Sequence, residues 1–157
     1  MSGRAAPQDV PLSHRVEGQG PPVTLLNGVS MTLGAWDPVR RALEDRFTVV
    51  RCDLRGQLRT PGPPPADLDG HLADLEQLLD HLAIEHTHLV GTSFGAVLAL
   101  LLAERRPQRV GALVLATVGP GGRPPAVETI QRWSDACDTV LAGGDRREFY
   151  RKMARDL

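Results

Sequence analysis

The segment from Gly91 to Gly95 reads Gly-Thr-Ser-Phe-Gly and holds a serine between two glycines, each two positions away. An apolar run precedes it and a longer one follows, which predicts a buried strand, a tight turn and a buried helix. The turn crowds the backbone around Ser93, and Gly91 and Gly95 relieve this crowding because they have no side chain. At the first turn of a helix, free backbone N–H groups favour an oxyanion. The pattern predicts a nucleophilic serine, with a structural glycine turn as the alternative.

Composition and charge exclude several classes of function. The chain has 157 residues, 41% of them hydrophobic and 24% charged, as in one ordinary globular domain. Its net charge of −1 gives no electrostatic basis for binding nucleic acid or a membrane surface. Cys52 and Cys137 lie too far apart for a Cys-x-x-Cys motif, so we expect reduced thiols, a cytoplasmic location and no metal or cofactor. We expect neither a signal peptide nor a membrane span.

Alternating strand and helix patterns surround the Ser93 turn. Apolar or β-branched runs predict buried strands at 23–26, 47–52 and 110–116, besides the strand that leads to Ser93, and an outer strand at 13–17. One helix is expected to start at Asp37, whose side chain would cap it, with Pro38 at the first helical position. A second is expected over about 67–82, where leucines form one face and Asp74 lies on the solvent-exposed side. A third is expected over 96–106. This alternation predicts an α/β fold with a mostly parallel sheet and flanking helices.

The chain divides into three expected parts, which are a flexible tail at 1–11, an α/β core at 12–118 and the start of a helical cap at 119–157. In a parallel sheet, ligands bind beyond the carboxyl ends of the strands. Asn27-Gly28, Asp53 and Ser93 each follow such an end. We therefore expect these residues to converge in space.

Three motifs together resemble the α/β-hydrolase superfamily, in particular its esterase, lactonase and haloperoxidase-like branch. They are Asn27-Gly28, the run Asp53-Leu54-Arg55-Gly56 and the Gly91–Gly95 turn. The resemblance is close over 15–116 and looser over 119–157, so it covers the N-terminal portion of that fold, without its last strands. The family usually has histidine where Asn27 stands, and glycine and serine where Leu58 and Thr60 stand.

The resemblance implies roles for individual residues. Ser93 is the expected nucleophile, and the backbone N–H groups of Val29 and Phe94 are the expected oxyanion hole. Asp53 and Arg55 are expected to hold their loop by hydrogen bonds. The implied substrate is a small-molecule carboxylic ester or lactone.

The general base and the acid that orients it are unknown from this sequence. In this fold they follow the nucleophile, in the order serine, acid, histidine. Acidic residues follow Ser93, although none of them stands at a strand end. No histidine follows Ser93, because all five precede it: His14, His71, His81, His86 and His88. His71 has the only suitable position, and we expect it to be solvated or to cap its helix.

We therefore expect a serine hydrolase that is incomplete and inactive as this chain alone. The alternatives are a non-catalytic binding module with a hydrolase-like fold and a truncated reading frame. The strand at 110–116 would leave an apolar sheet edge open, which favours self-association or a complementing chain.

Overall fold

The computed structural model describes residues 12–116, 143 and 145. The tail expected at 1–11 and nearly all of the cap expected at 119–157 lie outside the described residues. The strands are β1 (Ser13–Glu17), β2 (Pro22–Leu26), β3 (Thr48–Asp53), β4 (Thr87–Thr92) and β5 (Val110–Ala116). The helices are α1 (Asp37–Leu43), α2 (Leu68–His81) and α3 (Phe94–Arg105), with short 3-10 turns at Leu33–Trp36 and Pro107–Arg109.

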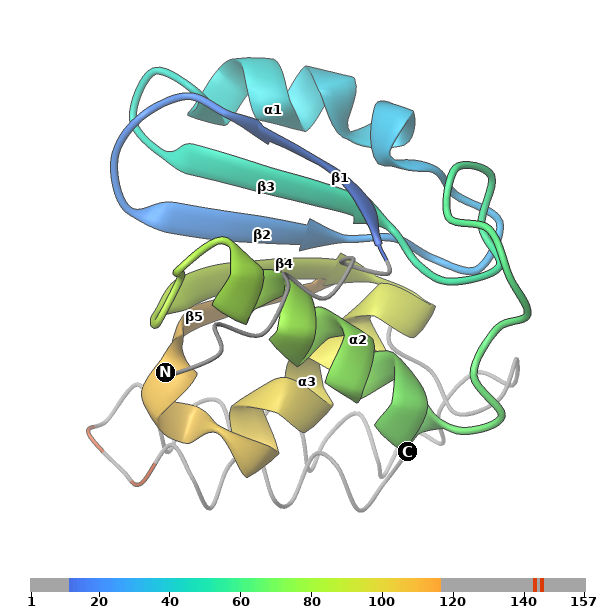
Figure 1. The fold of residues 1–157 in the computed structure, drawn as a ribbon. Coiled ribbons are helices and arrows are strands. Elements are labelled where there is room, and N and C mark those ends of the chain that lie inside the picture. The colour runs from blue at the N-terminus through green and yellow to red at the C-terminus, as the bar shows by residue number, and fades with distance from the viewer. Residues whose placement is uncertain (1–11, 117–142, 144, 146–157) are drawn as a thin grey trace, which may run out of the picture.

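The strands form one sheet in the order β1-β3-β2-β4-β5 (Figure 1). Only β1 is antiparallel to its neighbour, and the other pairs are parallel. This confirms the predicted mostly parallel α/β sheet. Leu26 at the end of β2 is paired with Gly91 near the end of β4, so the segments that follow these strands leave the sheet side by side.

Helices cover both faces of the sheet, with α1 on one face and α2 and α3 on the other (Figure 1). Alternate residues of each strand serve the two faces. Val50 and Cys52 pack in the cluster that contains the leucines of α2 and α3. Val23, Leu25 and Val49 pack with Trp36 below α1. This period of two, with apolar residues on both faces, is characteristic of a parallel sheet buried between helices.

The strand predicted to be buried at 110–116 is only half buried. Val110 is 3% exposed, but exposed and half-buried residues alternate along the rest of β5, and Val114 is 57% exposed. The reason is position, because β5 is the last strand of the described sheet.

Two expectations about acidic residues were wrong. Asp37 is the first residue of α1 and caps nothing with its side chain, because the carboxylate instead bonds Arg51, at 2.6 Å between Oδ1 and Nη1. Asp74 does not lie on the wet side of α2; it is 4% exposed and pairs with Arg55. In both cases the carboxylate forms an ion pair with an arginine from another segment. By contrast, Asp67 caps α2 by accepting a bond from the Gly70 N–H at 2.8 Å.

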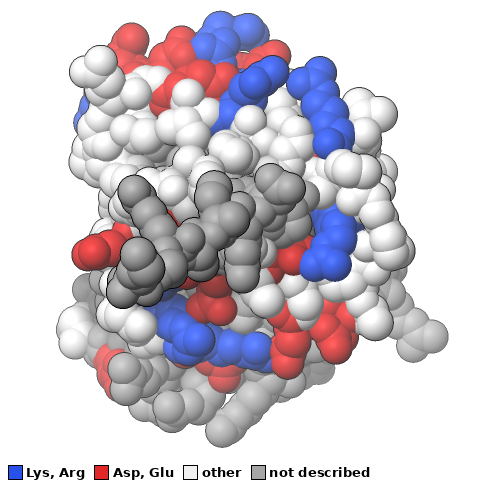
Figure 2. Space-filling model, viewed as in Figure 1, with Lys and Arg blue, Asp and Glu red and all other residues white. Residues whose placement is uncertain are grey.

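Basic and acidic side chains are interspersed over the part of the described surface that Figure 2 shows. Several of them pair across elements, such as Arg106 with Glu76 at 2.8 Å and Arg109 with Asp80 at 2.7 Å. Within the described ranges, no helix has the length and apolar character needed to cross a membrane.

Truncating a leucine of α2 tests the core. Leu75 has 0% exposure, so Leu75→Ala leaves a cavity and should lower the free energy of unfolding by about 2–5 kcal/mol. Leu68, on the same helix, is 37% exposed, and Leu68→Ala should cost less than about 1 kcal/mol. Urea denaturation measures both, and equal losses would contradict this assignment of the buried face.

Candidate active site

Ser93 joins β4 to α3 in an uncommon backbone conformation. Its φ of 51° and ψ of −119° lie where residues with a side chain are strained, typically by about 1–3 kcal/mol. Backbone hydrogen bonds to β5 and to α3 hold it there. The Ser93 N–H donates to Ala116 O at 2.9 Å, and the Ser93 carbonyl accepts from Ala96 N at 2.9 Å. The Ser93 side chain is exposed. Its hydroxyl is therefore free to meet a ligand.

The two flanking glycines stand where backbone segments almost touch. A Cβ on Gly91 would lie 2.4 Å from the Gly95 carbonyl oxygen. A Cβ on Gly95 would lie 2.2 Å from the Leu26 carbonyl oxygen, at the end of β2. No side chain fits at these distances, so both positions require glycine for α3 to begin this close to β4 and β2.

The segment after β2 lies against the Ser93 turn. A Cβ on Gly28 would be 3.4 Å from Ser93 Cβ. The Gly28 carbonyl accepts a bond from Met31 N at 3.1 Å, which closes a turn around Val29. Among the described residues, neither the Val29 N–H nor the Phe94 N–H has a hydrogen-bond acceptor. Two N–H donors that have no acceptor within the described part of the chain therefore come from segments that meet at Ser93.

Val29 and Phe94 also line one cavity of about 300 Å³. Its other lining residues come from the loop after β3 and from α2: Leu54, Arg55, Gly56, Gln57, Pro64 and His71. A ligand group in this cavity would lie beside both segments that carry the unpaired amides.

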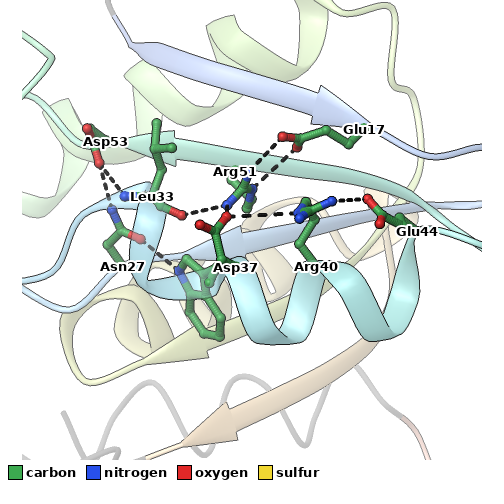
Figure 3. Close-up of polar contacts among 9 residues, drawn as sticks. Glu17, Asn27, Leu33, Asp37, Arg40, Glu44, Arg51 and Asp53 are labelled. Atoms are coloured by element: carbon green, nitrogen blue, oxygen red, sulfur yellow. Dashed lines mark hydrogen bonds and ion pairs between the residues drawn. The ribbon is translucent and has the colours of Figure 1, made fainter.

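Asn27, which stands where the resemblance implied a histidine, holds the turn after β2 from its buried side. The side chain is fully buried, and its Oδ1 accepts from Trp36 Nε1 at 2.7 Å. Its Nδ2 donates to Cys52 O at 2.9 Å and lies 3.1 Å from Gln57 Oε1. The same atom lies 3.2 Å from Asp53 Oδ1 (Figure 3). The departure from the family motif therefore leaves a buried amide whose polar atoms are all bonded.

The loop after β3 is fixed by the groups expected to fix it. Asp53 Oδ1 accepts from Leu33 N at 2.6 Å (Figure 3), and Arg55 Nε donates to Asp74 Oδ2 at 2.9 Å. Thr60 keeps a hydroxyl where the family has serine, and its Oγ1 donates to Asp53 O at 2.6 Å. Leu58, the other departure, is 79% exposed and needs no glycine conformation in this loop.

A buried arginine braces the same edge of the sheet. The Arg51 side chain is 5% exposed, and its guanidinium bonds Glu17 and Asp37, each at 2.6 Å, and the Leu33 carbonyl at 3.0 Å (Figure 3). The hydrogen bond from Arg51 lowers the pKa of Asp37 below its usual value. Leu33 is thus held at its N–H by Asp53 and at its carbonyl by Arg51, which fixes the end of the segment between β2 and α1.

Neither metal-binding nor thiol chemistry is indicated in the described part of the chain. No group of three or more histidine, cysteine or acidic side chains there could hold a metal ion. Cys52 is fully buried, and burial, reinforced by the Asp53 charge, raises the pKa of its thiol to about 12. The thiol is therefore unreactive, and Cys137 lies outside the described residues.

His71 is neither solvated nor a cap, contrary to the sequence-based expectation. It is 8% exposed and packs edge-on against the Phe94 ring, with 5.0 Å between centroids, because α2 lies over the start of α3. Its Nδ1 has no partner among the described residues. Burial lowers its pKa, although the Asp74 charge acts in the opposite direction. Asp74 bonds Arg55 instead, so His71 has no orienting acid there.

The other histidines lie away from Ser93 along the chain. His86 and His88 form a pair at the start of β4, with ring centroids 6.1 Å apart, and Ser93 follows the opposite end of that strand. His81 ends α2 and lies 6.1 Å from His14, between ring centroids. Among the described residues, none forms a hydrogen bond with the Ser93 hydroxyl as a general base would.

Sequence reasoning missed the contribution of Gln57. Its Oε1 accepts from Leu54 N at 2.9 Å, and its Nε2 donates to Gly28 O at 2.8 Å. The second contact joins residues 29 positions apart. No local pattern signals such a contact, because it depends on how two loops meet.

Replacing Ser93 by glycine tests the backbone strain. Ser93→Gly should raise the free energy of unfolding by about 1 kcal/mol, because relief of about 1–3 kcal/mol of strain exceeds the entropic cost of glycine. Ser93→Ala keeps the strain and should stay within about 0.5 kcal/mol of the parent. Guanidinium denaturation compares the three proteins, and a less stable glycine variant would show that the turn is not strained.

The buried His71 should make stability fall in acid. The folded protein disfavours the charged imidazole, while the unfolded chain protonates near pH 6.5. Protons therefore bind more readily to the unfolded state, and stability present above that pH is lost as the pH falls toward the lower pKa of the folded state. Urea denaturation at pH 8 and pH 5 should show a smaller loss for His71→Gln than for the parent, and identical losses would refute the assignment.

Comparison with known proteins agrees with this geometry. The sequence model described as "alpha/beta hydrolase fold" matches residues 21–145. A pimeloyl-[acyl-carrier protein] methyl ester esterase from Pseudoalteromonas atlantica is 32% identical over 111 residues, which are 69% of this chain and 42% of that protein. A hydrolase from Pseudomonas aeruginosa PA01 superposes with a TM-score of 0.68 at 27% identity, over 91% of this chain and 62% of its own.

An enol-lactonase from Burkholderia xenovorans LB400 also superposes with a TM-score of 0.68 at 27% identity, over 83% of this chain and 55% of its own. The chain spans between 31% and 42% of the length of the curated relatives it matches. The match to the family covers most of the sequence, including the Ser93 turn and both segments that meet it. The chain belongs to the α/β-hydrolase family.

Proposed function

We propose that this chain carries the nucleophile and the oxyanion hole of a serine hydrolase that acts on carboxylic esters or lactones. The observation that carries the proposal is the strained, exposed Ser93 beside two backbone amides that have no acceptor among the described residues. The names of an esterase and an enol-lactonase among its relatives support this substrate class.

In the proposed reaction, Ser93 Oγ attacks the substrate carbonyl carbon while a base removes the hydroxyl proton. The carbonyl oxygen becomes an oxyanion, to which the Val29 and Phe94 N–H groups donate. The tetrahedral intermediate collapses by breaking the bond to the alkoxy oxygen, which takes the proton back from the base. Water then hydrolyses the acyl-serine by the same steps and releases the acid.

The cavity of about 300 Å³ beside Val29 and Phe94 would hold a small acyl or lactone group. Leu54, Pro64 and Phe94 give it apolar walls, which suits the hydrocarbon part of such a substrate. Burial lowers the pKa of His71 in the lining, which favours its neutral form, and the charge of Arg55, which also lines the cavity, is paired with Asp74.

The base and its orienting acid are proposed to come from outside these 157 residues, because no histidine follows Ser93 in the sequence. A complementing chain of different sequence could approach at β5, where Val114 is 57% exposed at the edge of the described sheet. Without that contribution we expect little or no turnover by this chain alone.

Covalent labelling of Ser93 tests the proposal. A fluorophosphonate probe should modify Ser93, as shown by peptide mass spectrometry, and Ser93→Ala should abolish the adduct, whereas Ser30→Ala, in the neighbouring turn, should not. Turnover of p-nitrophenyl acetate should appear or rise when the C-terminal part of a homologous hydrolase is supplied. If neither labelling nor turnover occurs under that condition, the proposal is wrong.

The lack of a histidine after Ser93 favours one second candidate, a non-catalytic module that binds a small apolar ligand. Ligand binding that survives Ser93→Ala, with no covalent adduct on the parent protein, would identify that function instead.

A further inference from the structure

Gln57 connects the loop after β3 to the turn after β2 through both ends of its amide. The Oε1 atom accepts from Leu54 N at 2.9 Å and from Asn27 Nδ2 at 3.1 Å. The Nε2 atom donates to Gly28 O at 2.8 Å and to Val29 O at 3.2 Å. Every polar atom of this side chain therefore has a partner.

The orientation of this amide is fixed by the chemistry of its partners. The Leu54 N–H can only donate, so the atom facing it must be the oxygen. The Gly28 and Val29 carbonyls can only accept, so the atom facing them must be the NH₂ group. A flipped amide would set donor against donor and acceptor against acceptor. Gln57 is thus held in one arrangement, with its NH₂ group directed at the turn.

This contact, together with the Met31 N–H that donates to the same Gly28 oxygen at 3.1 Å, fixes where the Val29 N–H points. The Gly28 C=O and the Val29 N–H belong to the same peptide unit, which is planar and trans, so they point in opposite directions. By binding the Gly28 oxygen, Gln57 turns the Val29 N–H away from itself. The bond to Val29 O anchors the next peptide unit as well, so both units that flank the Val29 Cα are held.

We propose that Gln57 is the positioning residue of the oxyanion hole, acting on substrate only through the Val29 N–H. This inference rests on the proposed function for its catalytic consequence, but the orientation of the peptide unit can be measured without activity. Val29 needs such support because its side chain is 71% exposed and gives the turn little packing. Asn27 completes the arrangement by bonding Gln57 from the buried side.

Two variants separate the bonds of Gln57. Gln57→Met keeps the length of the side chain and removes all of its hydrogen bonds. Gln57→Glu keeps an oxygen for Leu54 and Asn27 but places a second oxygen against the Gly28 carbonyl, so only the contact with the turn becomes repulsive. Leu58→Met, at the adjacent and 79% exposed position, is the matched control. Circular dichroism and thermal unfolding verify that each variant is folded.

The first measurement is the residual dipolar coupling of the Val29 N–H bond in weakly aligned protein, which reports its orientation and order. The coupling should keep its parent value in Leu58→Met and shrink toward zero in both Gln57 variants, while couplings within β4 stay unchanged. In Gln57→Glu the coupling should recover at acid pH, because the protonated carboxyl can again donate to the Gly28 oxygen. An unchanged Val29 coupling in both folded variants would overturn the proposal.

The second measurement is the rate at which the fluorophosphonate labels Ser93 when the C-terminal part of a homologous hydrolase is supplied. Loss of one oxyanion donor typically slows catalysis by about 10²–10³-fold, so a misdirected donor should slow labelling by roughly 10-fold or more in both Gln57 variants. A lower maximal labelling rate, with the same probe concentration at half-maximal rate, identifies an effect on the reaction rather than on probe binding. A changed Val29 coupling with unchanged labelling would overturn the catalytic role of Gln57. Absence of labelling in the parent protein with that C-terminal part supplied would instead count against the proposed function, leaving the coupling to decide the positioning role.

Discussion

The close approach of α3 to the end of β2 is the constraint on which the candidate site depends. Only a glycine allows residue 95 to lie against the Leu26 carbonyl, where a Cβ would be 2.2 Å from the oxygen. The first turn of α3 therefore starts directly beside the segment that leaves β2, and Ser93 must take up the difference in chain direction in a strained conformation. The same approach brings Phe94 and Val29 to one cavity, which both residues line. The lack of side chains at Gly91 and Gly95 thus allows a nucleophile candidate and two hydrogen-bond donors to lie close together.

Polar side chains join the loops around this contact to one another. Asn27 and Gln57 bind the turn after β2 and the loop after β3 to each other, and Asp53 ties both to Leu33. Arg51 adds buried ion pairs at the same edge of the sheet. Breaking a buried network of this kind is costly because the remaining groups lose their partners in a low-dielectric interior. The network therefore favours one arrangement of the loops over its alternatives.

Most of the fold could be predicted from local patterns, whereas the partners of buried charged and polar groups could not. All five described strands and the three helices lie at or within a few residues of their predicted positions, because apolar periodicity, β-branched runs and glycine or proline breaks are local signals. The predictions for Asp37, Asp74 and His71 were wrong for one common reason. Each side chain contacts a residue from a segment distant in sequence: Arg51 for Asp37, Arg55 for Asp74 and Phe94 for His71.

The sequence by itself determined the turn at residue 93, since the spacing of Gly91, Ser93 and Gly95 between a strand pattern and a helix pattern predicts a turn of this kind. It also determined that no histidine follows that serine. Only the tertiary structure decided which groups surround it. Asn27 stands where the resemblance implied a histidine, and no motif in the sequence singles out Gln57. The hydrogen bond between these two residues joins positions 30 residues apart. The physical reason is that a hydrogen bond between loops depends on where two backbones meet, and that is set by the sheet register and by the closeness that glycine permits.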